Sequence, residues 1–198
     1  MRSRDLALIA LFAAFMCVLG LTPRVTLPFV PAPFTTQTLG VLLAGGVLGA
    51  RRGFLALVLF VVLVAFGLPV VAGGVGGMGV VLGPTGGFLL SFPLGAALTG
   101  WLVQHWWAKL GVVRVLVATV AGSLAVYPLG QAWLAVTTGM PADVAAWSWL
   151  VYLPGDLIKS AVATAAVLAV KRAYPLISPA QRHTAQDDVA PRSPGDTA

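Results

Sequence analysis

Long apolar segments alternate along this chain with short segments that are polar or rich in glycine and proline. Apolar segments of helical length occur at residues 5–22, 37–50, 53–68, 86–107, 113–138 and 150–171. A helix that crosses a bilayer needs about 20 apolar residues, and fewer where loops fill the membrane edge. The segments 37–50 and 53–68 are short, so a shallow hairpin is an alternative to two full spans. The pattern predicts an all-α integral membrane protein with six transmembrane helices.

The overall composition supports a membrane protein. Hydrophobic residues make up 59% of the chain and charged residues only 9%, whereas a soluble domain carries about 25% charged residues. The net charge of +6 comes from scattered basic residues that form no patch, so nucleic acid is not an expected partner. One cysteine, two distant histidines and no glutamate give no metal-ligand cluster, and no metal or cofactor is expected.

Basic residues flank the apolar segments asymmetrically. If the chain crosses the membrane six times from a cytoplasmic N-terminus, the cytoplasmic side receives Arg2, Arg4, Arg51, Arg52, Lys109, Arg114, Lys171 and Arg172. Only Arg24 then falls on the outer side. Because arginine and lysine are enriched in cytoplasmic loops, both termini are predicted to be cytoplasmic. The loops at 22–38 and 68–87 then lie on the outer side.

Two segments refine this organisation. Within 113–138, Tyr127-Pro128 interrupts the apolar run, and a proline inside a helix predicts a kink or a break. Residues 178–198 are polar, contain prolines and lack periodicity, which predicts disorder. The chain is therefore expected to comprise a six-helix membrane domain, residues 1–177, and a disordered cytoplasmic tail, residues 178–198.

Asp156 and Lys159 lie at the start of the last apolar segment. A charge near the bilayer centre costs roughly 2.5–3.5 kcal/mol even on the most lenient scale. Residues three apart share a helix face, about 6 Å from each other. This placement favours a ligand-binding pair in which the carboxylate accepts and the ammonium donates hydrogen bonds. An ion pair that only neutralises itself, a snorkelling lysine and a proton relay are the alternatives.

Other segments offer weaker signals. Gln37 and the threonines beside it could contact a ligand, although threonine also caps helices at such positions. Eight glycines between Gly73 and Gly87 predict a mobile or closely packed cap, or serve helix packing. Ala10 and Ala14 form a small-xxx-small pattern, which serves close helix packing either inside the bundle or against another protein.

Several motifs closely resemble those of the BioY family. They are Thr36-Gln37-Thr38-Leu39-Gly40, Gly49-Ala50-Arg51-Arg52-Gly53, Gly67-Leu68-Pro69-Val70, Gly83-Pro84-Thr85-Gly86-Gly87-Phe88 and Pro154-Gly155-Asp156-Leu157-Ile158-Lys159. The resemblance covers about residues 5–172 and keeps the order of the motifs. Members of this family are the substrate-binding (S) components of energy-coupling-factor biotin transporters.

The resemblance implies a six-helix protein of the bacterial cytoplasmic membrane that binds biotin near its outer face. The residues it assigns to the biotin pocket are Gln37, Gly83, Thr85, Gly86, Asp156 and Lys159. It also implies that Ala10 and Ala14 dock on a transmembrane coupling subunit, and that two cytoplasmic ATPases supply energy. The chain itself contains no ATP-binding motif, which agrees with this division of labour.

Two other functions are open from the residues themselves. Asp156 could titrate in a proton-coupled carrier of a small polar solute, since membrane carboxylates often serve such proteins. Asp156 could also act as acid or base in an intramembrane hydrolase or transferase. Because the sequence shows no nucleophile motif or metal set, an enzyme is not expected.

Overall fold

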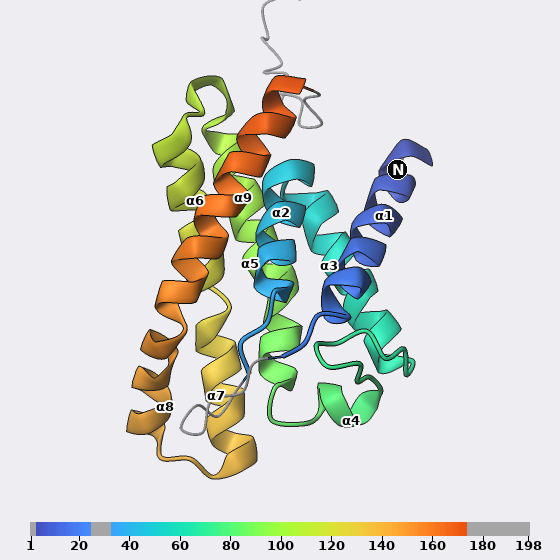
Figure 1. The fold of residues 1–198 in the computed structure, drawn as a ribbon, viewed down its shortest axis with the longest axis vertical. Coiled ribbons are helices and arrows are strands. Elements are labelled where there is room, and N and C mark those ends of the chain that lie inside the picture. The colour runs from blue at the N-terminus through green and yellow to red at the C-terminus, as the bar shows by residue number, and fades with distance from the viewer. Residues whose placement is uncertain (1–2, 25–32, 174–198) are drawn as a thin grey trace, which may run out of the picture.

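A computed structural model describes residues 3–24 and 33–173 of the chain (Figure 1). Arg2, the middle of the first predicted outer loop and the predicted tail at 178–198 lie outside the described residues. The described part consists of helices and connecting loops and contains no named strand, and an isolated bridge pairs Val71 with Val75.

The α-helices are α1 Ser3–Gly20, α2 Gln37–Leu48, α3 Ala50–Ala65, α4 Met78–Val81, α5 Gly86–His105, α6 Val112–Leu124, α7 Tyr127–Thr138, α8 Ala142–Ser148 and α9 Leu153–Ala173. Short 3-10 helices cover Trp107–Lys109 and Trp149–Val151. Within residues 3–24 and 33–173, four helical segments are long and apolar enough to cross a membrane, namely α1, α5, the α6–α7 segment at 112–138, and α9. The helices α2 and α3, with 12 and 16 residues, are shorter. The protein is therefore an all-α membrane protein.

The long segment at 112–138 breaks where the sequence predicts it. Helix α6 ends at Leu124 and α7 begins at Tyr127, with Pro128 in its first turn. Proline is tolerated there because the first turn of a helix leaves its N–H groups without intrahelical partners. Helix α7 continues roughly along α6 in Figure 1. Its first residue, Tyr127, is buried.

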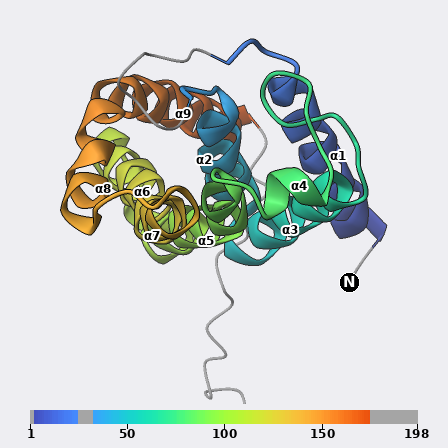
Figure 2. The same ribbon diagram turned by 90° about the horizontal axis from the view of Figure 1, so that it is seen from below.

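The main helices run alternately up and down the bundle, and α5 lies in the middle. Figure 2, seen along the bundle, places α5 between the α2–α3 side and the α6–α7 side, and α5 contacts all four of these helices. Small residues permit this close packing. A Cβ at Gly100 would lie 2.4 Å from the nitrogen of Ala50, and a Cβ at Gly95 would lie 2.8 Å from the oxygen of Gly122.

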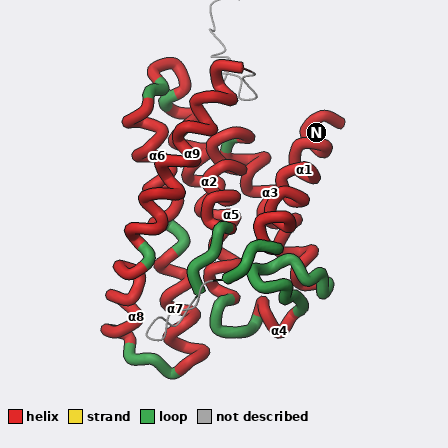
Figure 3. The backbone as a smooth tube through the Cα atoms, viewed as in Figure 1, coloured by secondary structure: helices red, strands yellow, loops and turns green. Residues whose placement is uncertain are grey.

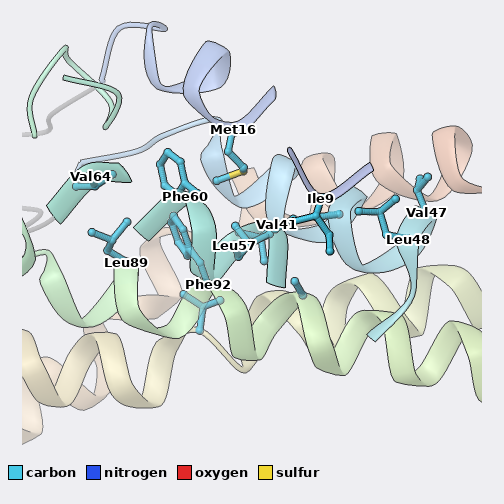
Figure 4. Close-up of a cluster of buried hydrophobic side chains, with 14 of the residues drawn as sticks. Ile9, Met16, Val41, Val47, Leu48, Leu57, Phe60, Val64, Leu89 and Phe92 are labelled. Atoms are coloured by element: carbon cyan, nitrogen blue, oxygen red, sulfur yellow. The ribbon is translucent and has the colours of Figure 1, made fainter. Parts of the chain in front are cut away.

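The apolar core is concentrated between α1, α2, α3 and α5. Figure 4 shows its side chains, among which Met16, Phe60 and Leu57 are completely buried. Burial of a large apolar side chain contributes about 1.5–3 kcal/mol in water; in a membrane this packing instead gives the helices their close, specific contacts. Buried polar side chains, namely Thr119, Ser123, Asp156, Ser160 and Thr164, lie on α6 and α9.

Connecting loops gather at one end of the bundle, which we call the loop end. Figure 3 shows there the described parts of the α1–α2 connection and the α3–α5 connection, opposite the start of α1. The end of α9 lies at the same end of the bundle as the start of α1 in Figure 1. Any site between the two connections is therefore accessible from the loop end.

Candidate ligand-binding site

A cavity of about 140 Å³ lies at the loop end, enclosed by both connections and by α2, α5, α6, α7 and α9. Four of the residues expected in a pocket line it: Gln37, Thr85, Asp156 and Lys159. They come from two helices, α2 and α9, and from the connection before α5, which are far apart in sequence. The fold therefore brings together residues that the sequence could identify only one motif at a time.

Asp156 is the most constrained polar group of the cavity. It lies in the first turn of α9, after Pro154, and only 4% of the residue is exposed. Oδ1 accepts from Lys159 Nζ at 2.9 Å, and Oδ2 accepts from Ser123 Oγ at 2.8 Å and from the hydroxyl of Tyr127. Donors from α6, α7 and α9 thus replace water around a buried carboxylate, which would otherwise be costly.

The ion pair keeps unused hydrogen-bonding capacity. A carboxylate offers about four acceptor positions, and three of those on Asp156 are occupied, which leaves one on Oδ1. An ammonium has three N–H donors, and Lys159 uses one of them while 19% of its side chain is exposed. The pair can therefore offer one acceptor and two donors side by side. This arrangement suits a ligand group in which an N–H stands next to a carbonyl.

Aromatic rings form much of the remaining wall. The ring of Phe34 packs on Tyr152 at a centroid distance of 4.8 Å, and Phe88 meets Tyr127 edge-on at 6.3 Å. All four residues line the cavity. Such rings supply apolar surface with little conformational freedom, which suits the body of a small ligand.

Gln37 is engaged mainly with the backbone of the α3–α5 connection. It begins α2 and is 2% exposed. Its Nε2 donates to the oxygen of Val70 at 3.3 Å, and its Oε1 accepts from the nitrogen of Ala72 at 3.4 Å. The end of α1 is pressed against the same loop, since a Cβ at Gly20 would lie 1.6 Å from the Val70 oxygen. Gln37 therefore clamps this loop next to the cavity.

The three residues expected from the Gly-Pro-Thr-Gly-Gly-Phe motif have different positions. Thr85 lines the cavity, whereas Gly83 and Gly86 are not among its described lining residues. The Gly83 oxygen accepts from Trp133 Nε1 at 2.9 Å. A Cβ at Gly86 would lie 1.8 Å from the oxygen of Val81, so only glycine fits there. These glycines build the turn that starts α5.

Ala10 and Ala14 lie on the exposed side of α1. Ile9, Ala13 and Met16 form the buried side of the same helix, whereas Ala7, Ala10 and Ala14 are exposed. The small-residue pattern could serve close packing inside the bundle or against another protein. Because these alanines are exposed, they do not pack inside the bundle. Their face is available to lipid or to another protein.

Several residues that contribute to the cavity were not among the predicted site residues. Ser123 and Tyr127 donate to Asp156, and Phe34 and Tyr152 supply aromatic wall. The sequence shows only that Ser123 and Tyr127 carry hydroxyl groups in an apolar segment, which does not by itself indicate that they meet Asp156. The described residues contain no group of three or more His, Cys, Asp or Glu that could hold a metal ion.

A buried ion pair inside a helical membrane bundle, with aromatic walls and loops above it, defines a membrane-embedded binding protein for a small polar ligand. A sequence model of the BioY family matches residues 1–176, and the chain belongs to this family. This result confirms the resemblance seen in the motifs.

Proteins with similar sequences match this chain over most of their own lengths. A biotin transporter BioY of Rhizobium etli is 43% identical over 185 residues, which cover 89% of this chain and 98% of that protein. A probable biotin transporter BioY of Bacillus subtilis is 43% identical over 168 residues, covering 84% and 89% of the two chains. A crystal structure of the S-component for biotin from an ECF-type ABC transporter superposes with a TM-score of 0.81 at 29% identity, covering 87% of this chain and 95% of that one.

Proposed function

We propose that this protein is the substrate-binding subunit of an energy-coupling-factor transporter and takes up biotin. The relatives that it matches over nearly their full lengths are biotin transporters, and its structural neighbour is an S-component for biotin. The observation that carries the proposal is the Asp156–Lys159 pair in a cavity at the loop end. The protein is a transporter subunit and not an enzyme.

Biotin matches the chemistry that this cavity offers. Its ureido ring presents two N–H donors beside one carbonyl, and the Asp156–Lys159 pair offers one acceptor and two donors. Its thioether ring and alkyl chain are apolar, which suits the walls formed by Phe34, Phe88 and Tyr152. Thr85 adds a hydroxyl near the ligand, while Gly83 and Gly86 hold the turn that carries Thr85.

The topology we propose has six spans, with both termini in the cytoplasm of a bacterial cell. The spans are α1, α2, α3, α5, the α6–α7 segment and α9. The connections near Arg51 and Lys109 and the end of α9 near Lys171 then face the cytoplasm. The loop end, with Arg24, faces outward, which agrees with the positive-inside rule. Residues 1–177 form the biotin-binding membrane domain, and residues 178–198 form a cytoplasmic tail.

Ala10 and Ala14 are the proposed contact with the coupling subunit. Small residues on an exposed helix face allow a partner helix to approach closely within lipid. Two cytoplasmic ATPases would then supply energy through that subunit. The exposure of the Ala7–Ala10–Ala14 face supports this assignment, since the face is not used inside the bundle.

A proton-coupled carrier is the alternative function. The residues buried inside the bundle disfavour it. Beyond Asp156, the hydroxyl groups of Thr119 on α6 and Thr164 on α9 lie within hydrogen-bonding distance of each other. One turn further along each helix stand Val115 and Val167, which are 0% and 2% exposed. A proton path from Asp156 would have to cross this apolar layer, whereas capture of biotin from the loop end does not.

Equilibrium binding of labelled biotin to the purified protein in detergent tests the proposal. We expect a dissociation constant below micromolar, which corresponds to a binding free energy beyond roughly −8 kcal/mol. Biotin should be recovered chemically unchanged, which excludes the intramembrane enzyme that uses Asp156. Failure to bind biotin, with binding of another small solute coupled to proton uptake, would favour the carrier instead.

A further inference from the structure

The charges lining the cavity do not balance. Among the described residues that line it, the charged ones are Arg24, Asp156 and Lys159. Asp156 and Lys159 neutralise each other at 2.9 Å. Arg24 forms no ion pair with any residue in the described part of the chain. The cavity therefore carries one net positive charge, located on a guanidinium.

The position of Arg24 suits contact with a ligand at the entrance of the cavity. The residue follows the end of α1, is exposed and also lines the cavity, so it lies at the cavity opening. Its side chain packs on the α3–α5 connection, because a Cβ at Gly73 would lie 3.1 Å from both Cδ and Nε of Arg24. Gly73, at φ +89°, leaves room for this side chain.

We propose that Arg24 is the residue that selects the anionic end of the ligand. A guanidinium matches the geometry of a carboxylate and binds it through two parallel hydrogen bonds. The self-neutralised Asp156–Lys159 pair then takes the uncharged ureido end. If the proposed function holds, biotin lies with its carboxylate at the cavity entrance and its ureido ring at the ion pair. The cavity thus distinguishes a monocarboxylate from its neutral analogues.

The test compares biotin with biotin amide, in which a neutral carboxamide of nearly the same shape replaces the carboxylate. The wild-type protein should bind biotin about tenfold more tightly than the amide, the size expected for one charge-assisted contact at a partly exposed site. Arg24→Gln should remove this preference by weakening biotin alone, and Arg24→Lys should retain part of it. Arg51→Gln, an exposed cation at the opposite end of the bundle, is the control and should change neither ligand.

Salt gives a second readout. Raising the ionic strength should weaken biotin binding in the wild type and have little effect in Arg24→Gln, because exposed charges are screened. The inference is overturned if Arg24→Gln keeps the acid-over-amide preference, or if it weakens both ligands equally, which would indicate a role in loop packing only. If the wild type binds neither ligand, the proposed function itself fails, so the two failures are distinguishable.

Discussion

Tyr127, the first residue of α7, donates its hydroxyl to Oδ2 of Asp156 in the first turn of α9. The helix break before Pro128 is thereby connected to the proposed ligand site. Because α6 ends at Leu124 and α7 starts anew, the ring of Tyr127 can also meet Phe88 on α5. The helix break could be predicted from Pro128. The hydrogen bond that Tyr127 donates to Asp156 at this break could not be predicted.

Removing this donor should weaken ligand binding without removing the wall of the cavity. Tyr127→Phe keeps the ring and deletes the hydroxyl, leaving Asp156 with Ser123 and Lys159. Hydrogen bonds to charged groups contribute about 1.5–3 kcal/mol, so we expect biotin affinity to fall by at least tenfold. Titration calorimetry on the purified variant measures this. Unchanged affinity would show that the hydroxyl is dispensable for holding the carboxylate.

Loosening the clamp at Gln37 should act mainly on the rate of ligand release. Gln37→Ala removes the contacts to Val70 and Ala72, which are long at 3.3 and 3.4 Å, so the effect should be moderate. We expect biotin dissociation to accelerate about three- to tenfold, since net hydrogen bonds of this kind are worth about 0.5–1.5 kcal/mol. Chase experiments with unlabelled biotin measure the rate.

A matched control for the clamp exists at the other end of the bundle. Gln104 accepts from the nitrogen of Ala50 at 3.0 Å, far from the cavity. Gln104→Ala should leave the dissociation rate unchanged. Equal acceleration in both variants would mean that general loosening of the bundle, and not the loop next to the cavity, controls release.

Enlarging the small-residue face of α1 should separate binding from transport. Ala14→Leu places a larger side chain on the exposed face and leaves the buried Ala13 and Met16 untouched. We expect unchanged biotin binding in detergent and loss of biotin uptake in cells that supply the coupling partners. Uptake equal to wild type in Ala14→Leu would contradict a docking role for this face. Val113→Leu, at an exposed position of α6 outside this face, is the control and should transport normally.

How far the sequence predicts this protein depends on whether a feature is local. Asp156 and Lys159 were predictable because charges stand out in an apolar segment, and their spacing alone puts them on one face. The helices at the predicted ranges and the break before Pro128 follow in the same way from apolar length and from proline chemistry.

Features that depend on packing between distant segments were not predictable. Ser123 reaches Asp156 only because α6 packs on α9. Gln37 was expected to meet the ligand, yet its amide is engaged with a loop more than thirty residues away in sequence. Gly83 and Gly86 belong to a recognisable motif, but only the structure distinguishes glycines that build a turn from residues that line a cavity.

The central claim is that the Asp156–Lys159 pair binds the ligand. The most direct measurement is equilibrium binding of labelled biotin to Asp156→Asn and Lys159→Ala beside the wild type. Each variant should lose about 2 kcal/mol or more of binding free energy, the cost of leaving a buried charged group without its partner. Thermal unfolding of the same samples controls for misfolding. If both variants are folded and bind biotin as tightly as the wild type, the proposed site is wrong.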